Sequence, residues 1–120
     1  MIIGIHHAQI TVPRGKEDDA RRFYCGILGL KEVEKPASLQ GRGGFWLQAG
    51  NAQVHVGTED GVERNLTKAH VAYEVSDLGH WQKVASVNGI ETVPGEDFPG
   101  HDRFEFRDPF GNRIELIQRL

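Results

Sequence analysis

Three histidines and one glutamate stand at matched positions in two halves of the chain, and together they could bind a divalent metal ion. His7 opens the run HAQITV, and His70 opens the similar run HVAYEV in the second half. His55 and Glu115 lie in the later runs QVHV and RIEL, which begin at or just after a Gly-Asn pair. Imidazole suits Zn, Fe, Ni and Cu, and a mixed nitrogen and oxygen set also suits Mn. Four such ligands would leave two positions of an octahedral ion open to water or substrate.

These four residues are expected on one kind of face because side chains alternate along a strand. In the run 7–12, alternate apolar side chains face one way, and His7 and Gln9 face the other. The other three candidates likewise alternate with apolar neighbours. A single histidine on a strand is more often hydrogen-bonded or exposed than a ligand. The metal hypothesis therefore rests on the two matched pairs, His7 with His70 and His55 with Glu115, which are expected on the same side. If the halves pair about a pseudo-twofold axis, these faces would form one cavity with a polar floor.

The elements that would position these residues repeat in the two halves. Each half reads as a strand, a helix and three strands, which predicts an α+β fold. Two tandem βαβββ modules, 1–60 and 67–120, would form a single domain, 1–120. The strands are predicted at 5–12, 30–35, 43–49, 53–58, 69–75, 90–93, 102–107 and 113–118, and the helices at 17–28 and 77–88. The polar segment 58–68 would link the modules.

Cap and turn residues support this arrangement. Ser76 or Asp77 is expected to cap the second helix. The segment Phe45–Asn51 (FWLQAGN) is similar to Phe106–Asn112 (FRDPFGN), and each leads into a short alternating strand. Within the second of these, Asp108-Pro-Phe-Gly is expected to form a turn.

Composition excludes several classes of function. The chain has 120 residues with 14 basic and 17 acidic side chains, a net charge of −3, and no basic block, so sequence-independent binding to nucleic acid is not expected. No apolar run approaches the roughly 20 residues that a membrane span needs, and a cytoplasmic location is expected. The single cysteine, Cys25, cannot form an internal disulfide.

Four longer motifs carry a resemblance to a known family. They are HAQITV at 7–12, ARRFYCGILGL at 20–30, AHVAYEV at 69–75 and RDPFGNRIEL at 107–116. Over essentially its whole length the chain resembles the glyoxalase/bleomycin resistance/extradiol dioxygenase group, the vicinal oxygen chelate superfamily. The resemblance implies two βαβββ modules whose mixed sheets curl around a metal cavity.

The resemblance also implies a metal site and a style of reaction. Members bind a divalent ion through the first and last strands of each module, which corresponds here to His7, His55, His70 and Glu115. The ion would be Ni, Zn, Co, Mn or Fe, and it would chelate two neighbouring oxygens of a small-molecule substrate. Glu115 is then the candidate catalytic base. A homodimer is expected, with the cavity completed within one chain or across a swapped dimer.

A glyoxalase-like lyase or isomerase is the favoured function within this family, and two alternatives stay open. Glyoxalase I usually has a glutamate at the place of His55, which lowers the odds of that enzyme itself. An Fe(II) extradiol-type dioxygenase needs two histidines and one glutamate, which His7, His70 and Glu115 would supply, although His55 would crowd the open positions. The second alternative is a metal-free small-molecule-binding or antibiotic resistance protein, and four intact candidate ligands argue against it.

Two further residues are candidates for substrate binding. Phe104 has the pattern of a core residue, so its neighbour Arg103 is expected to face the cavity. There Arg103 would bind an anionic group of the substrate. Gln9 shares the expected ligand face. His6 and His80 are predicted to be structural, and Trp46 is predicted to lie in the core.

Overall fold

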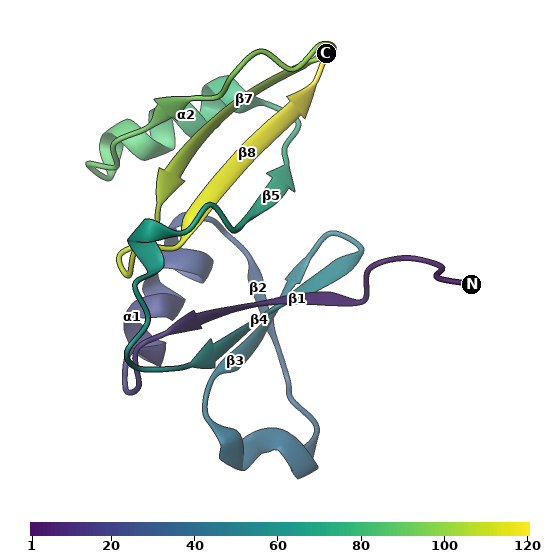
Figure 1. Ribbon diagram of the computed structural model, residues 1–120, viewed down its shortest axis with the longest axis vertical. Coiled ribbons are helices and arrows are strands. Elements are labelled where there is room, and N and C mark those ends of the chain that lie inside the picture. Colours follow the sequence, from purple (N-terminus) through teal and green to yellow (C-terminus); the bar gives the residue numbers. More distant parts are fainter. The chain divides into compact units, whose positions relative to one another are not determined.

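Each half of the chain forms its own four-stranded mixed sheet in the computed structural model, which describes residues 1–120 (Figure 1). The chain divides into a first unit, Met1–Val62, and a second unit, Glu63–Leu120. This architecture confirms the α+β fold of two tandem βαβββ repeats. None of the helices is long and apolar enough to cross a membrane.

In the first unit the sheet has the strand order β1-β4-β3-β2. The strands are β1 His7–Val12, β2 Lys31–Val33, β3 Phe45–Ala49 and β4 Ala52–Thr58. The first and last strands, β1 and β4, pair in parallel, and the other pairs are antiparallel. Helix α1 spans Glu17–Arg21 and continues as a π-helical segment, Arg22–Ile27, and a 3-10 helix spans Ala37–Arg42.

The second unit repeats this topology with the order β5-β8-β7-β6. Its strands are β5 His70–Glu74, β6 Val93–Pro94, β7 His101–Arg107 and β8 Arg113–Arg119, with a 3-10 helix at Arg64–Leu66. Again the first and last strands pair in parallel. Helix α2, Leu78–Val87, begins after Asp77, whose Oδ1 accepts a hydrogen bond from the His80 backbone N–H at 3.2 Å. This contact confirms the predicted helix cap.

Alternation along the strands gives each sheet one apolar face, as predicted. The buried strand residues include Val12, Phe45, Leu47, Val54 and Val56 in the first unit, and Phe104, Phe106, Ile114 and Leu116 in the second. Arg21 of α1 lies over the ring of Phe45, 4.6 Å from its centroid. His55 and Glu115 alternate with these apolar residues and are nevertheless buried, at 6% and 5% exposure.

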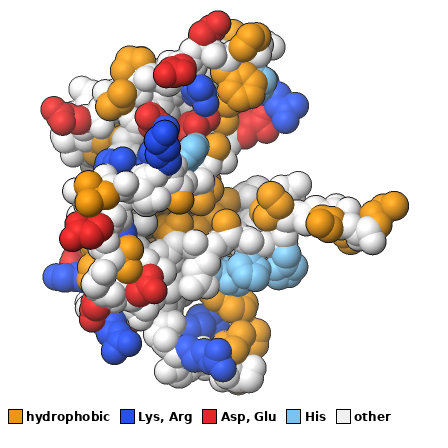
Figure 2. All heavy atoms as spheres, in the orientation of Figure 1, with side chains coloured by type: hydrophobic (Ala, Val, Ile, Leu, Met, Phe, Trp, Pro, Cys, Tyr) orange, Lys and Arg blue, Asp and Glu red, His pale blue; other side chains and the backbone are white.

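Several predicted boundaries differ from the structure, among them that of the strand predicted at 90–93, which spans only Val93–Pro94. The first strand begins at His7 and not at residue 5, and the preceding residues leave the sheet with Ile2, Ile3 and Ile5 exposed. Figure 2 shows hydrophobic side chains along this N-terminal segment. The predicted helix 17–28 is an α-helix only over its first turns. Farther along, the Leu28 N–H donates to the Phe23 carbonyl, a spacing of the π-helix type, so the turn is wider there.

The two modules also align differently from the prediction at their third strands. Phe45 pairs with Val56, and Phe104 pairs with Leu116, so Phe45 corresponds to Phe104 and not to Phe106. The reason is the longer turn between β7 and β8. Asp108 builds that turn, since its Oδ1 accepts hydrogen bonds from the backbone N–H groups of Phe110 and Asn112, each at 2.9 Å.

Candidate metal centre

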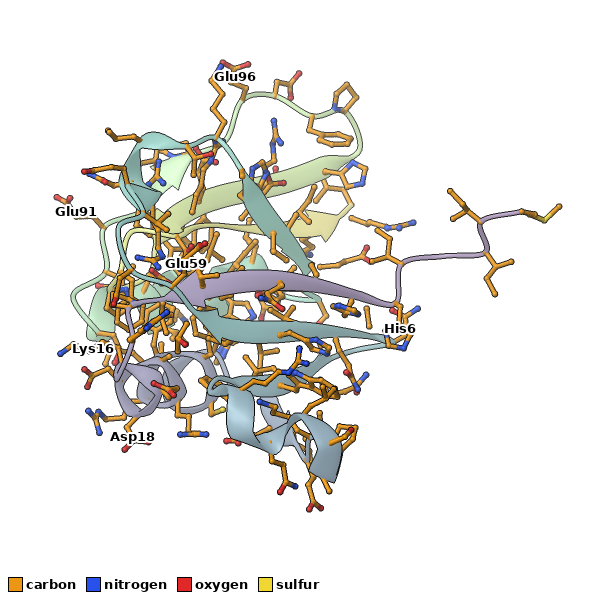
Figure 3. All side chains as sticks on the ribbon, turned by 60° about the horizontal axis from the view of Figure 1, so that its bottom comes forward. His6, Lys16, Asp18, Glu59, Glu91 and Glu96 are labelled. Carbon is orange, nitrogen blue, oxygen red and sulfur yellow. The ribbon has the colours of Figure 1, made fainter.

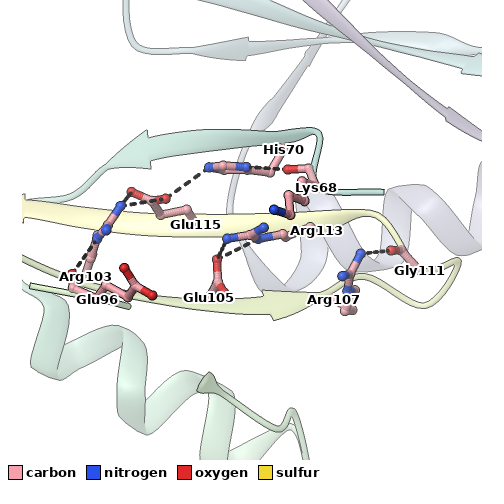
Figure 4. A network of polar contacts seen from close by, with 9 residues as sticks. All are labelled: Lys68, His70, Glu96, Arg103, Glu105, Arg107, Gly111, Arg113 and Glu115. Atoms are coloured by element: carbon pink, nitrogen blue, oxygen red, sulfur yellow. Dashed lines mark hydrogen bonds and ion pairs between the residues drawn. The ribbon is translucent and has the colours of Figure 1, made fainter. Parts of the chain in front are cut away.

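The second unit brings two of the predicted ligands, His70 and Glu115, into direct contact (Figure 4). His70 opens β5 beside Arg113 of β8, and Glu115 pairs with Ala72. The parallel register therefore sets the two side chains diagonally on the same face of the sheet. His70 Nε2 lies 3.1 Å from Glu115 Oε1.

A second contact indicates which nitrogen of His70 carries the proton. His70 Nδ1 lies 2.9 Å from the backbone carbonyl oxygen of Lys68. A carbonyl only accepts, so Nδ1 is the donor, and in the neutral ring Nε2 holds a lone pair. That lone pair faces a carboxylate oxygen of Glu115. Two hydrogen-bond acceptors this close repel each other unless a cation lies between them. That cation is either a proton on the imidazole or a metal ion.

The spacing of this pair fits a metal ion as well as a proton. Ligand atoms at adjacent positions of a divalent ion, each about 2.1 Å away, lie about 3.0 to 3.4 Å from each other. The Nε2–Oε1 distance of 3.1 Å falls in that interval. The carbonyl partner on the outer nitrogen of His70 is also the usual second contact of a metal-binding histidine. The chemistry of this half of the predicted donor set therefore fits a divalent cation.

Arg103 of β7 is a cation that lies beside Glu115. Its Nη1 lies 3.4 Å from Glu115 Oε1 and 3.5 Å from Oε2. Its Nε donates to the Glu96 carbonyl oxygen at 3.1 Å. Farther along the same sheet, Arg113 Nε donates to Glu105 Oε2 at 2.6 Å. The predicted substrate-binding residue thus lies against the predicted base.

The first unit also brings its two predicted ligands together, but as stacked rings. The imidazoles of His7 and His55 have centroids 4.0 Å apart and an interplanar angle of 15°. Trp46 stacks on the other side of His55, again at 4.0 Å and at 3°. The ligating lone pairs of an imidazole lie in the plane of its ring, so two nearly parallel rings do not direct them at one atom. This arrangement presents the two rings as a stack and not as a chelating pair.

Hydrogen bonds engage His55 as well. Its Nε2 lies 2.9 Å from Gln53 Oε1, and Gln53 Nε2 lies 3.5 Å from Gln48 Oε1. Gln48 Nε2 donates to the carbonyls of Gly50 and Ala52. In this chain of amides Gln53 Oε1 is an acceptor, so His55 Nε2 is a donor. Burial, followed by the nearby His7, His6 and Lys35, lowers the pKa of the His55 imidazole and favours its neutral form.

The four predicted ligands thus form two pairs, one in each unit. Neither unit contains a cluster of three or more His, Cys, Asp or Glu side chains arranged to hold a metal ion. Gln9 is exposed and pairs with His55 in the β1–β4 register, and its amide lies against Gly57, where a Cβ would be 2.7 Å from Gln9 Nε2.

Two residues of this region have roles that the sequence pattern did not reveal. Trp46 is not a core residue, because Phe45 and Leu47 on either side of it fill the core and direct its ring toward His55. His6 lies just before β1 (Figure 3), and its Nδ1 is 2.9 Å from His7 Nδ1. Since His6 precedes the first paired residue of the strand, strict alternation does not apply to it.

Comparison with known proteins identifies the family. The model of the Glyoxalase/Bleomycin resistance protein/Dioxygenase superfamily matches residues 4–116. The chain belongs to this superfamily. A crystal structure of a "putative glyoxalase family protein" from Bacillus anthracis is 37% identical, covers 100% of this chain and 98% of its own, and has a TM-score of 0.93.

Two further proteins that this chain resembles have different functional names. The "Putative ring-cleaving dioxygenase MhqO" of Bacillus subtilis (strain 168) is 28% identical over 98% of this chain, and the chain spans 40% of that relative's length. The genomically encoded fosfomycin resistance protein FosX from Listeria monocytogenes shares the fold, with a TM-score of 0.77 at 15% identity. That match covers 100% of this chain and 96% of the FosX chain.

Proposed function

We propose that this protein is a divalent-metal-dependent enzyme of the superfamily, a glyoxalase-like lyase or isomerase that acts on a small oxygenated substrate. The proposed ligands are His7, His55, His70 and Glu115, and the imidazoles of His7 and His55 would have to leave their stack to bind the same ion. The observation that carries the proposal is the contact between His70 Nε2 and Glu115 Oε1 at 3.1 Å, with the outer nitrogen of His70 held by the Lys68 carbonyl. A homodimer belongs to the proposal, with the ligands drawn from one chain or from two.

The residues of the second unit suggest how such a reaction would proceed. A bound divalent ion supplies Lewis acidity, which stabilises negative charge on two neighbouring substrate oxygens. Glu115 acts as the base, and a carboxylate oxygen takes a proton from the carbon next to a carbonyl and returns it to a neighbouring atom. The Lys68 carbonyl keeps His70 in one tautomer. Burial of Glu115 limits competition from water.

Ring cleavage by an Fe(II) extradiol-type dioxygenase is the second candidate. The observation in its favour is that His55 donates to Gln53 and stacks on Trp46, which leaves His7, His70 and Glu115 as a set of two histidines and one carboxylate. The printed name of the Bacillus subtilis relative supports the same alternative. Iron in the purified protein and oxygen uptake with catechols would favour this candidate over the first.

Elemental analysis of the untagged protein, purified without chelators, tests the metal proposal directly. We expect about one divalent ion per chain in the wild type. We expect its loss in Glu115→Gln and in His70→Ala, because each removes one member of the acceptor pair. Circular dichroism of both variants should match the wild type, since β5, β7 and β8 pair through their backbones.

His80→Ala is the matched control, because His80 is an exposed histidine of α2 that lies against Trp81. It should keep the metal. His6→Ala is not a suitable control, since His6 contacts His7. Equal loss of metal in the His80 variant would contradict the assignment. A wild type that binds no ion, even after each is added back, would favour a metal-free binding or antibiotic resistance protein.

A further inference from the structure

Arg103 is held in place from several sides in the second unit. Its Nε donates to the Glu96 carbonyl oxygen at 3.1 Å, and its guanidinium lies over the ring of Phe98, 5.2 Å from the centroid. Its Nη1 faces both oxygens of Glu115. Only 25% of the side chain is exposed. A long, flexible side chain is therefore fixed beside the predicted base.

The segment before β7 is shaped around this side chain. A Cβ built at Gly95 would lie 2.7 Å from Arg103 Cγ and 2.9 Å from Nε, closer than real atoms approach. Only glycine at position 95 leaves room for Arg103 in this conformation. The same segment supplies the Glu96 carbonyl and the Phe98 ring, so one short stretch of chain provides three of the contacts.

The contact between Arg103 and Glu115 is nevertheless a loose one. Its N–O distances of 3.4 and 3.5 Å exceed the roughly 2.7 to 2.9 Å of a good guanidinium–carboxylate pair. Within the second unit only Nε and Nη1 make hydrogen bonds, so the edge of the guanidinium that carries Nη2 has donors to spare. A fixed guanidinium with free donors is suited to a planar anion such as a carboxylate.

We propose that Arg103 serves as the counter-ion of Glu115 in the metal-free protein and as the receptor for a substrate carboxylate in the metal-bound protein. A divalent cation on Glu115 neutralises the carboxylate, so Glu115 no longer needs Arg103. The guanidinium then offers its Nη1 and Nη2 edge to an anion next to the metal. The substrate class that follows is an oxygenated acid, which chelates through two neighbouring oxygens and carries a further anionic oxygen. This inference rests on the proposed function.

Two small chelating molecules distinguish this role from a purely structural role of Arg103. Oxalate chelates a metal through two neighbouring oxygens and leaves two anionic oxygens for a guanidinium. Acetohydroxamate also chelates through two neighbouring oxygens but has no second anionic group. Binding of each is measured on Mn(II)-loaded wild type and Arg103→Gln, by electron paramagnetic resonance, below the concentration that removes the metal. Mn(II) affinity itself is measured first on both proteins.

We expect Arg103→Gln to bind Mn(II) at least as tightly as the wild type, because a competing cation is gone. Oxalate affinity should fall about tenfold or more, the usual effect of losing a charged hydrogen-bonding partner, and acetohydroxamate affinity should stay within about twofold. Arg119→Gln, an exposed arginine at the end of β8 that pairs with Glu74, is the control for charge and should change neither.

Two results would overturn the inference, and they can be told apart. Normal Mn(II) binding with an unchanged oxalate affinity, or with equal losses for both probes, would give Arg103 a purely structural role and leave the proposed function standing. No Mn(II) binding by the wild type would overturn the proposed function and this inference with it.

Discussion

Neighbouring side chains contact the His55 imidazole more completely than they contact the other predicted ligands. It lies between the rings of Trp46 and His7, and its Nε2 donates to Gln53. Burial is the main reason that the pKa of its imidazole is lowered from the ordinary value of 6.5. A neutral, stacked imidazole contributes packing and one hydrogen bond whether or not it also binds a metal.

This histidine should make the stability of the metal-free protein depend on pH. Because the folded pKa lies below 6.5, the unfolded chain binds more protons between the two values. The stability due to neutral His55 is therefore fully present above pH 6.5 and is lost as the pH falls toward the lowered pKa. His55→Gln cannot titrate and should flatten this part of the profile, measured as the free energy of unfolding in urea at about pH 7.5 and 5.5 with a chelator present. Identical slopes in the two proteins would show that His55 does not carry this effect.

The sequence predicted the strand positions of the candidate residues better than their mutual contacts. Alternation correctly predicted that His55 and Glu115 would be separated from the core positions Val56 and Leu116, because the period of a strand is two residues. It could not predict which of the three consecutive apolar residues from 45 to 47 would leave the core, since an unbroken run has no period. The contact between His70 and the Lys68 carbonyl could not be predicted either, because every residue has a backbone carbonyl whatever its type.

At the level of elements, the segment that enters β3 passes unusually close to β4. Gly44 has a φ of +77°, and a Cβ there would lie 2.2 Å from the Val56 carbonyl oxygen. Val56 follows His55, so this close approach lies next to one of the predicted ligands. Any other residue at position 44 would have to push β3 and β4 apart.

Alanine at three glycines separates the causes of this constraint. Gly44→Ala should destabilise the protein by about 3 kcal/mol or more, because it adds both a backbone strain and a steric clash. Gly50→Ala has a φ of +58° but open space around the Cβ, so about 1 to 2 kcal/mol is expected. Gly41→Ala has neither problem and should change stability by less than about 1 kcal/mol. Urea unfolding gives the three values, and a Gly44 variant no worse than the Gly50 variant would exclude the clash.

The order of the elements was predictable, whereas their fine geometry was not. The longer strands matched because each alternates over several residues, whereas the strand predicted at 90–93 shares only Val93 with β6. The apolar stripe of 17–28 predicts a helix, but over so short a segment the spacing of Ala20, Phe23, Tyr24 and Leu28 does not distinguish an α-helical from a π-helical turn. The similarity between the sequences of the two halves aligned Phe45 with Phe106, because a Phe and a Gly-Asn pair occur in both segments. The longer turn between β7 and β8 makes this alignment differ from the structural one.

At the scale of the whole molecule, the four proposed ligands are divided equally between two units that each have their own sheet and core. This division explains why the repeat pointed to them so clearly. It also limits what either unit can do alone, since each contains only one pair.

A bound metal should therefore stabilise the folded protein. A ligand that binds only the native state adds about 2.7 kcal/mol at a free concentration of 100 times its Kd. The Tm of the chelator-treated wild type should rise by several degrees on addition of Mn(II) or Zn(II), and that of Glu115→Gln should not. Calorimetry with matched concentrations of Mg²⁺ checks for general ionic effects. An equal rise in both proteins would place the stabilising ion elsewhere.

The parallel pairing of the first and last strands in each unit has a consequence for how the protein is made. On the ribosome, β1 has no partner until Thr58 has been synthesised, because β4 is its only neighbour. At a synthesis rate of about 5 to 20 residues per second, the backbone of β1 stays unpaired for roughly 2 to 10 seconds. The apolar residues before it, Ile2, Ile3 and Ile5, stay exposed throughout. Nascent chains stalled while β4 is still inside the ribosome should thus be the ones that chaperones hold, and those stalled after β4 has emerged should be released.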